Sequence, residues 1–167
     1  MTSMFLHGGW LHILGNMWYL WIFGDNVEDR LGHRRFLLFY LACGIAAGLV
    51  HYGLNPSSRV PTIGASGAVA GVLGAYFFCY PKARVDILIL FFFYVDIIAV
   101  PAAFVLFFWF ILQLFNGVLS LGADTGVTGG VAWWAHVGGF LAGVFLVRLS
   151  PRARRSRQAV YRVRFDR

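Results

Sequence analysis

One serine in this chain stands at the start of a glycine-rich apolar segment, residues 64–76. If the segment is helical, Gly67, Gly71 and Gly74 recur at i, i+4 and i+7 and form a face nearly free of side chains. Ser66 lies at the edge of that face, in the first turn, where backbone N–H groups lack partners within the helix. A hydroxyl beside free N–H donors is placed as a nucleophile with an oxyanion site would be. The alternative is a serine that caps a tightly packed helix.

A histidine in the last apolar segment is the expected partner of this hydroxyl. His136 follows an aromatic pair, and Gly139 and Gly143 come three and seven residues later, on the same helical face. If the two glycine faces pack together, Ser66 and His136 lie at similar depth near the outer ends of adjoining helices. A neutral imidazole there would take the hydroxyl proton during attack and return it to the leaving amine.

Further polar side chains stand at the start of the first apolar segment. His12 and Asn16 are four residues apart and share a helical face, whereas His7 precedes the helix or points elsewhere. Polar groups at this depth usually face protein or water and are often functional; the alternative is histidines satisfied by water and lipid headgroups. His7 and His12 are a poor ligand pair on one helix, with no cysteine or carboxylate nearby. The sequence predicts no metal site and no cofactor.

Composition places these residues in a membrane protein. Hydrophobic residues make up 59% of the 167 residues and charged residues only 13%, and the mean hydropathy is +0.71. Soluble domains carry about twice that share of charge. The apolar residues gather in five blocks, each able to cross or nearly cross a bilayer: Leu11–Phe23, Phe36–Leu54, Ile63–Tyr80, Ile87–Leu121 and Val131–Leu149. The expected fold class is an all-α polytopic membrane protein.

Two boundaries within this organisation need interpretation. The fourth block is too long for one simple span, so we expect Ile87–Val100 to be interfacial or re-entrant and Pro101–Val118 to be the fourth span, with proline in its first turn. The polar stretch Asp25–Gly32 is expected to be a cytoplasmic turn. A Gly-rich stretch, Leu119–Gly130, is expected to be a mobile outer loop and a candidate lid.

Basic residues give the orientation. Thirteen of the 14 Lys and Arg residues follow spans one, three and five, and only Arg59 falls on the other side. The positive-inside rule therefore places the first two of these connections and the carboxyl tail in the cytoplasm, and Met1 outside. We divide the chain into a membrane domain, 1–150, and an Arg-rich cytoplasmic tail, 151–167. The tail directly follows a span and suits anionic lipid headgroups better than nucleic acid.

Three motifs, in this order and at these depths, resemble those of the rhomboid family of intramembrane serine proteases: His12-xxx-Asn16, Gly64-Ala65-Ser66-Gly67 and Ala135-His136-Val137-Gly138-Gly139. The resemblance covers roughly residues 2–149. It implies a rhomboid-like helical bundle, with five spans visible of a basic six. It also implies an active site in a water-filled cavity open to the outer side.

The resemblance also implies roles for individual residues. Ser66 would be the nucleophile and His136 the general base of a dyad that has no acidic third member. His12, Asn16 and the Ser66 backbone N–H would form the oxyanion hole. Gly64, in the serine motif, and His7, which matches a family histidine near the cavity, are assigned with them to the oxyanion and substrate site.

Two departures from the family pattern stand out. The family's first helix and the large loop after it have no counterpart here, which agrees with the topology in calling for one more span before Thr2. Some family members also carry an aromatic residue four positions after the serine, stacked on the catalytic histidine. That position is Ala70 here, so the orientation of His136 must come from other residues.

The expected function is that of an intramembrane serine endopeptidase acting on transmembrane protein substrates in the lipid bilayer, with no nucleic-acid partner. The protein is expected to be an integral, multi-pass protein of a bacterial inner membrane, with its carboxyl terminus in the cytoplasm. One alternative is a non-catalytic rhomboid-like protein that binds membrane clients, although such relatives typically lack one or both of the dyad residues. Another is a small transporter or channel subunit, for which the chain shows no evident inverted repeat.

Overall fold

The computed structural model describes residues 2–56, 62–121 and 131–153. The part of the chain that it describes is a bundle of five helices with one short 3-10 turn and one hairpin: η1 Thr2–Phe5, α1 Trp10–Leu31, α2 His33–Leu54, α3 Ser66–Cys79, β1 Arg84–Phe91, β2 Tyr94–Pro101, α4 Ala102–Ser120 and α5 Trp133–Leu149. The helical bundle expected from the sequence is thus confirmed. The candidate lid (122–130) and most of the Arg-rich tail (154–167) lie outside the described residues.

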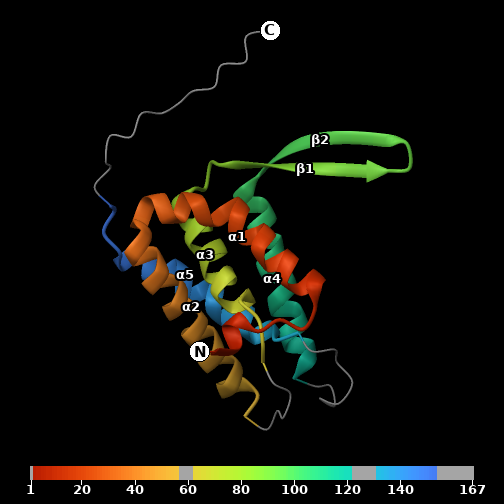
Figure 1. Cartoon of the computed structure of the whole chain (residues 1–167). Coiled ribbons are helices and arrows are strands. Elements are labelled where there is room, and N and C mark those ends of the chain that lie inside the picture. The colour runs from red at the N-terminus through yellow and green to blue at the C-terminus, as the bar shows by residue number, and fades with distance from the viewer. Residues whose placement is uncertain (1, 57–61, 122–130, 154–167) are drawn as a thin grey trace.

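Helix α3 is the centre of the bundle and contacts the other four helices (Figure 1). Every residue from Gly67 to Tyr76 is buried, so α3 has no polar face to turn outward. Large apolar side chains on the outer helices are exposed instead, among them Trp18 of α1, Leu38 of α2 and Phe104 of α4. This pattern is what a membrane-embedded bundle requires, because its exposed surface faces lipid rather than water.

The two glycine faces predicted from the sequence do pack against each other. A Cβ added to Gly139 of α5 would lie 2.9 Å from the carbonyl carbon of Gly67, and one on Gly143 would lie 2.7 Å from Cα of Gly71. On α3, a Cβ on Gly74 would lie 2.9 Å from the carbonyl carbon of Phe140. No side chain fits between the two helices at these positions, so their backbones are in direct contact.

Helix α2 and the amino-terminal turn complete the packing around α3. The position of a Cβ on Gly71 is 2.5 Å from Sγ of Cys43, so α2 covers the same glycine from another side. The side chain of Met4, in η1, fits over Gly44 of α2. The carbonyl of Ser3 accepts a hydrogen bond of 2.9 Å from the N–H of Gly64. The turn before α1 thereby holds the loop that leads into α3.

The helices differ in length relative to a membrane. Helices α2 and α4 are long and apolar enough to cross one, and α3 and α5 are shorter apolar helices. The first helix differs from expectation, because the polar stretch from Asp25 is not a turn. Helix α1 continues through it and ends at Leu31. The next residue, Gly32, has a φ of 81° that allows the chain to reverse, and its N–H donates a hydrogen bond to the carbonyl of Glu28. The apolar block ends at Phe23, where the sequence becomes polar, but the helix itself continues for eight more residues.

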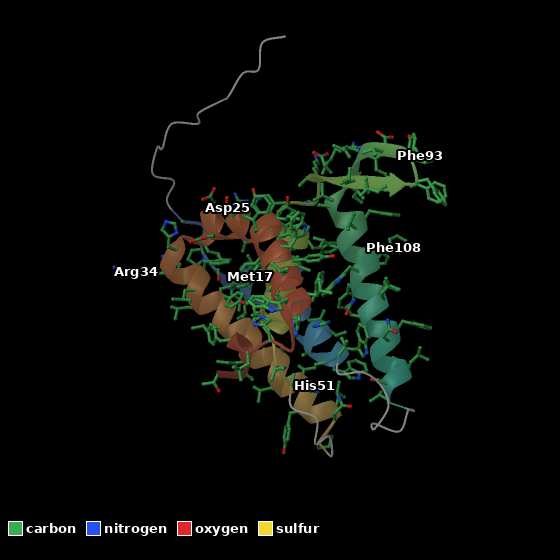
Figure 2. All side chains as sticks on the ribbon, turned by 45° about the vertical axis from the view of Figure 1, so that its right-hand side comes forward. Met17, Asp25, Arg34, His51, Phe93 and Phe108 are labelled. Carbon is green, nitrogen blue, oxygen red and sulfur yellow. The ribbon has the colours of Figure 1, made fainter. Side chains whose placement is uncertain are left out.

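Strands β1 and β2 form an antiparallel hairpin that the all-α expectation did not include. The register pairs Arg84 with Pro101 at the base and Phe91 with Tyr94 at the tip, leaving a two-residue loop. The hairpin lies crosswise at the end of α4 and projects away from the bundle (Figure 1). Asp25 and Arg34 lie at the same end of the molecule, and His51 lies at the other (Figure 2).

The backbone contact between α3 and α5 predicts an unusual response to alanine. Gly→Ala normally stabilises a helix by about 0.5–1 kcal/mol, but we expect Gly143→Ala to lower the Tm, because overpacking costs about 1–3 kcal/mol. The matched control is Gly48→Ala in α2, where a Cβ meets nothing within 4 Å. Thermal unfolding in detergent micelles measures both variants. A Gly143→Ala protein at least as stable as Gly48→Ala would contradict the contact.

Candidate active site

A cavity of about 520 Å³ opens among α1, α3, α4 and α5. Ser66 and His136 both line it, and so do His12 and Asn16. Its other walls come from these helices and the segments before α3 and α5: Gly8, Leu11, Gly15, Tyr19, Ile63, Val69, Ala70, Leu73, Trp109, Val131 and Ala132. The structure therefore brings together, in one cavity, four of the six residues that the sequence assigned to chemistry.

Ser66 is the first residue of α3 and does not cap it. The capping position belongs to Ala65, and no side chain caps this end. The first backbone bond runs from the N–H of Val69 to the carbonyl of Ala65, at 2.9 Å. The N–H groups of residues 66–68 therefore precede the helical ladder. The capping role that was the alternative for this serine is not the one that the structure describes.

His136 is held on several sides. Its Nδ1 lies 2.8 Å from Oε1 of Gln113, a side chain of α4 that is only 7% exposed. The indole of Trp109 lies beside the imidazole, with ring centroids 5.9 Å apart and planes 33° apart. The indole of Trp133 meets it edge-on, with centroids 6.2 Å apart. Helix α4 thus supplies the aromatic neighbour that Ala70 does not provide.

Ser66 and His136 share the cavity without being joined. Within the described part of the chain, no hydrogen bond links the two side chains. Contacts between a nucleophile and its base are often long in unliganded sites and tighten when substrate binds. The arrangement therefore has the residue types and the common cavity that a dyad needs.

His12 and Asn16 lie across the cavity on α1. The side-chain nitrogen of Asn16, which is 7% exposed, donates a hydrogen bond of 2.8 Å to the carbonyl of His12. An amide nitrogen carries two hydrogens, so one donor remains. Nδ1 of His12 accepts a hydrogen bond of 3.3 Å from the N–H of Gly8. Because this nitrogen accepts, the neutral ring carries its proton on Nε2. Two N–H donors are thus available on this wall.

Gly64 and His7 do not line the cavity but contact His12. Gly64 has a φ of 118°, a conformation that favours glycine. A Cβ there would lie 2.7 Å from both Cε1 and Nε2 of His12, so glycine is needed for the imidazole to occupy its place. The ring of His7 meets that of His12 edge-on, with centroids 5.2 Å apart. Both residues position His12.

Sequence reasoning did not assign Gln113 or Trp109 to the site. Gln113 was visible as a polar residue near the outer end of an apolar span, and such residues commonly face the interior of a bundle. Nothing local indicates which helix it faces. Trp109 precedes Gln113 by one helical turn and had no signal of its own, because the span contains many aromatic residues.

With this geometry, comparison with known proteins identifies the family. The sequence profile of the Rhomboid domain matches residues 1–152. The chain belongs to the rhomboid family. Similar proteins include rhomboid protease GluP of Bacillus subtilis, 43% identical over 75 residues, and the human presenilin-associated rhomboid-like protein, mitochondrial, 35% identical over 92 residues. Another is rhomboid-like protein 11, chloroplastic, of Arabidopsis thaliana, 41% identical over 71 residues.

These matches are partial on both sides. They cover 45%, 54% and 42% of this chain, and 14%, 24% and 25% of GluP, the human protein and the plant protein. The chain therefore spans well under two thirds of these relatives. No solved structure matches it.

Family membership makes the chain an integral membrane protein. The names of its relatives cover bacterial, mitochondrial and chloroplast proteins, so kinship alone does not select the membrane.

Proposed function

We propose that this rhomboid protein is an intramembrane serine endopeptidase that cleaves peptide bonds in or next to transmembrane segments. The observation that carries the proposal is the shared cavity, which contains a hydroxyl, an imidazole with Nδ1 already engaged, and two N–H donors on the facing helix. Its position among membrane-embedded helices suits substrates that reach it from the bilayer.

The mechanism follows from what each group can do. Oγ of Ser66 attacks the carbonyl carbon of the scissile bond while Nε2 of His136 takes the hydroxyl proton. The C–N bond then breaks, His136 returns the proton to the leaving amine, and the new amino terminus departs. Water attacks the remaining ester, with His136 again as the base, and the acid product leaves as Ser66 recovers its proton.

The oxyanion formed in each attack needs preorganised donors. We assign this role to the remaining N–H of Asn16, the Nε2–H of His12 and the backbone N–H of Ser66. These donors belong to α1 and α3, which pack against each other. Gly64 and His7 contribute by keeping the ring of His12 in place.

The second candidate is a non-catalytic member that binds membrane clients. A cavity among membrane helices would serve binding as well as cleavage, but binding alone does not require a serine and a histidine in the same cavity. Labelling in membranes with a serine-directed fluorophosphonate separates the two. Labelling that depends on Ser66 supports the protease, whereas an unreactive serine in a folded, client-binding protein supports the alternative.

Location and lipid partners complete the proposal. We propose a bacterial inner membrane as the location. The clustering of the basic residues on one side supports a carboxyl terminus in the cytoplasm. The Arg-rich tail would interact there with anionic headgroups, at about 1 kcal/mol per basic residue near the surface. The cavity would then open towards the outer side.

The dyad predicts that Ser66→Ala and His136→Ala each abolish cleavage of a transmembrane reporter. Loss of either group costs a factor on the order of 10⁶ in kcat in a soluble serine protease, so turnover should fall below detection. Matched controls are Ser120→Ala, whose hydroxyl donates to the carbonyl of Gly117 within α4, and His33→Ala at the opposite end of the bundle. Substantial cleavage by purified Ser66→Ala would remove the proposal.

The oxyanion assignment predicts a smaller, graded loss. Asn16→Ala should lower kcat by about 10²–10³, which is the cost of one such donor, because His12 and the backbone N–H remain. Asn55→Ala is the matched control, since its amide makes the same kind of bond to a carbonyl four residues earlier but stands at the end of α2. Steady-state cleavage in detergent measures both. Equal turnover of the two variants would refute this role of Asn16.

A further inference from the structure

We propose that Gln113 is the positioning residue of this site, holding His136 in the tautomer that acts as a base. The inference rests on the proposed function and names the group that takes the place of an acidic third member. It is carried by two hydrogen bonds of one buried amide.

The orientation of the amide follows from its first partner. Nε2 of Gln113 donates a hydrogen bond of 3.1 Å to the backbone carbonyl of Trp109. A carbonyl oxygen only accepts, so the NH₂ group of Gln113 must face it, and the reversed amide would set two oxygens against each other. Oε1 therefore faces His136, with no freedom to exchange places.

The proton on His136 follows in turn. Oε1 of Gln113 only accepts, and it lies 2.8 Å from Nδ1 of His136, so this nitrogen must carry the hydrogen. In a neutral imidazole the other nitrogen, Nε2, then has the free lone pair. That is the nitrogen a base needs for the hydroxyl of Ser66. The backbone of Trp109 thus fixes the tautomer of His136 through a single side chain, without any charge.

Two variants of Gln113 separate positioning from packing. Gln113→Met keeps the length of the side chain but removes the acceptor, and we expect kcat to fall about 10–100-fold, as when an orienting partner of an imidazole is lost, with a smaller change in KM. Gln113→Glu keeps an acceptor in either protonation state and should restore much of the rate. Asn116→Leu is the matched control, since its amide bonds to the carbonyl of Leu112 and does not reach His136.

A readout independent of activity tests the same point. Nitrogen-15 spectra of the full chain in micelles, with His136 assigned from its loss in His136→Ala, should show Nδ1 protonated and Nε2 bare. Gln113→Met should populate both tautomers. If Gln113→Met keeps the tautomer and kcat of the unaltered chain, the inference is overturned and the protease is untouched. If the tautomer shifts as expected in a chain that cleaves nothing, the proposed function fails and the positioning role stands.

A second inference rests on a different observation, the β1–β2 hairpin. We infer that its tip inserts shallowly into the cytoplasmic leaflet of the bilayer that holds the helices. The strand register puts apolar pairs on both faces, with Ile87 opposite Ile98 on one and Leu88 opposite Ile97 on the other. At the tip, Phe92 and Phe93 are 89% and 102% exposed. Each face also carries one aspartate, Asp86 or Asp96, and the carboxylate of Asp96 accepts hydrogen bonds from the hydroxyl of Tyr94 and the N–H of Ile97. A lone two-stranded hairpin is marginal in water, and one that is otherwise apolar on both faces needs an apolar partner.

Lipid is the partner that the position of the hairpin favours. Its base joins α4, where the N–H of Ala102 bonds to the carbonyl of Ala83 at 2.9 Å. Phe104 and Phe108, in the first two turns of α4 after this junction, are exposed as well. Its direction across the helices keeps it near one membrane boundary (Figure 1), and Lys82 and Arg84 stand at its base on the predicted cytoplasmic side. The unpaired strand edges rule out the deep hydrocarbon region, so the insertion is shallow.

Spin labels measure this depth in the full chain. A nitroxide at Phe93→Cys, in a Cys43→Ala/Cys79→Ala background in phosphatidylcholine–phosphatidylglycerol vesicles, should collide more with oxygen than with a water-soluble nickel chelate. The order should reverse at Lys82→Cys, the control at the base. Circular dichroism identifies cysteine-substituted variants that unfold. In that case Phe93→Trp replaces the spin label, and its quenching by brominated lipid is measured as the increase over the unaltered chain with its six tryptophans. Nickel access at the tip equal to that at Lys82, or spin–spin broadening from a second copy, would overturn the inference.

Discussion

The arrangement of this bundle depends on one backbone contact, the approach of α5 to α3 along their glycines. In lipid, burial of apolar surface gives helices little reason to associate, so van der Waals packing at short range must provide it. Because Gly71 and Gly143 carry no side chains, the two axes come close enough for Ser66 and His136, near the amino-terminal ends of α3 and α5, to reach one cavity. The same contact leaves α4 to pack against α5, which brings Gln113 to the imidazole.

The two imidazoles that line this cavity have hydrogen-bond partners of opposite kinds, and both partners are uncharged. The backbone N–H of Gly8 donates to Nδ1 of His12, so in the neutral ring Nε2 carries the hydrogen and can donate it. The amide oxygen of Gln113 accepts from Nδ1 of His136, so in the neutral ring Nε2 has the free lone pair and can accept. Neither partner brings a buried charge with its desolvation cost, which in a membrane-embedded site is a considerable saving of free energy. Identical side chains thus differ in chemistry because of what lies behind each ring.

What the sequence predicted and what it missed divide along physical lines. The bundle and the contact between the glycine faces of α3 and α5 follow from the spacing of residues within single helices. Both could therefore be anticipated from the sequence, beginning with the glycines that follow Ser66. The hairpin could not be anticipated, because both of its faces are apolar apart from one aspartate each, so its strands lack the usual alternation of apolar and polar residues. Its loop also reverses at Phe92, with a φ of 52°, instead of at the usual glycine or asparagine. The bond between Gln113 and His136 joins residues far apart in the chain, and only packing determines which helix faces meet.

The shortness of α3 has a consequence for the lipid around it. Its 14 residues span about 21 Å at about 1.5 Å per residue, whereas a hydrocarbon core measures about 30 Å. If its inner end reaches the cytoplasmic boundary, Ser66 lies several ångströms beneath the opposite surface. Either the bilayer thins locally or a column of water descends to the hydroxyl, and both responses carry an elastic or solvation cost that grows with membrane thickness. The free energy of the folded bundle in its membrane therefore depends on the thickness of the host bilayer as well as on temperature.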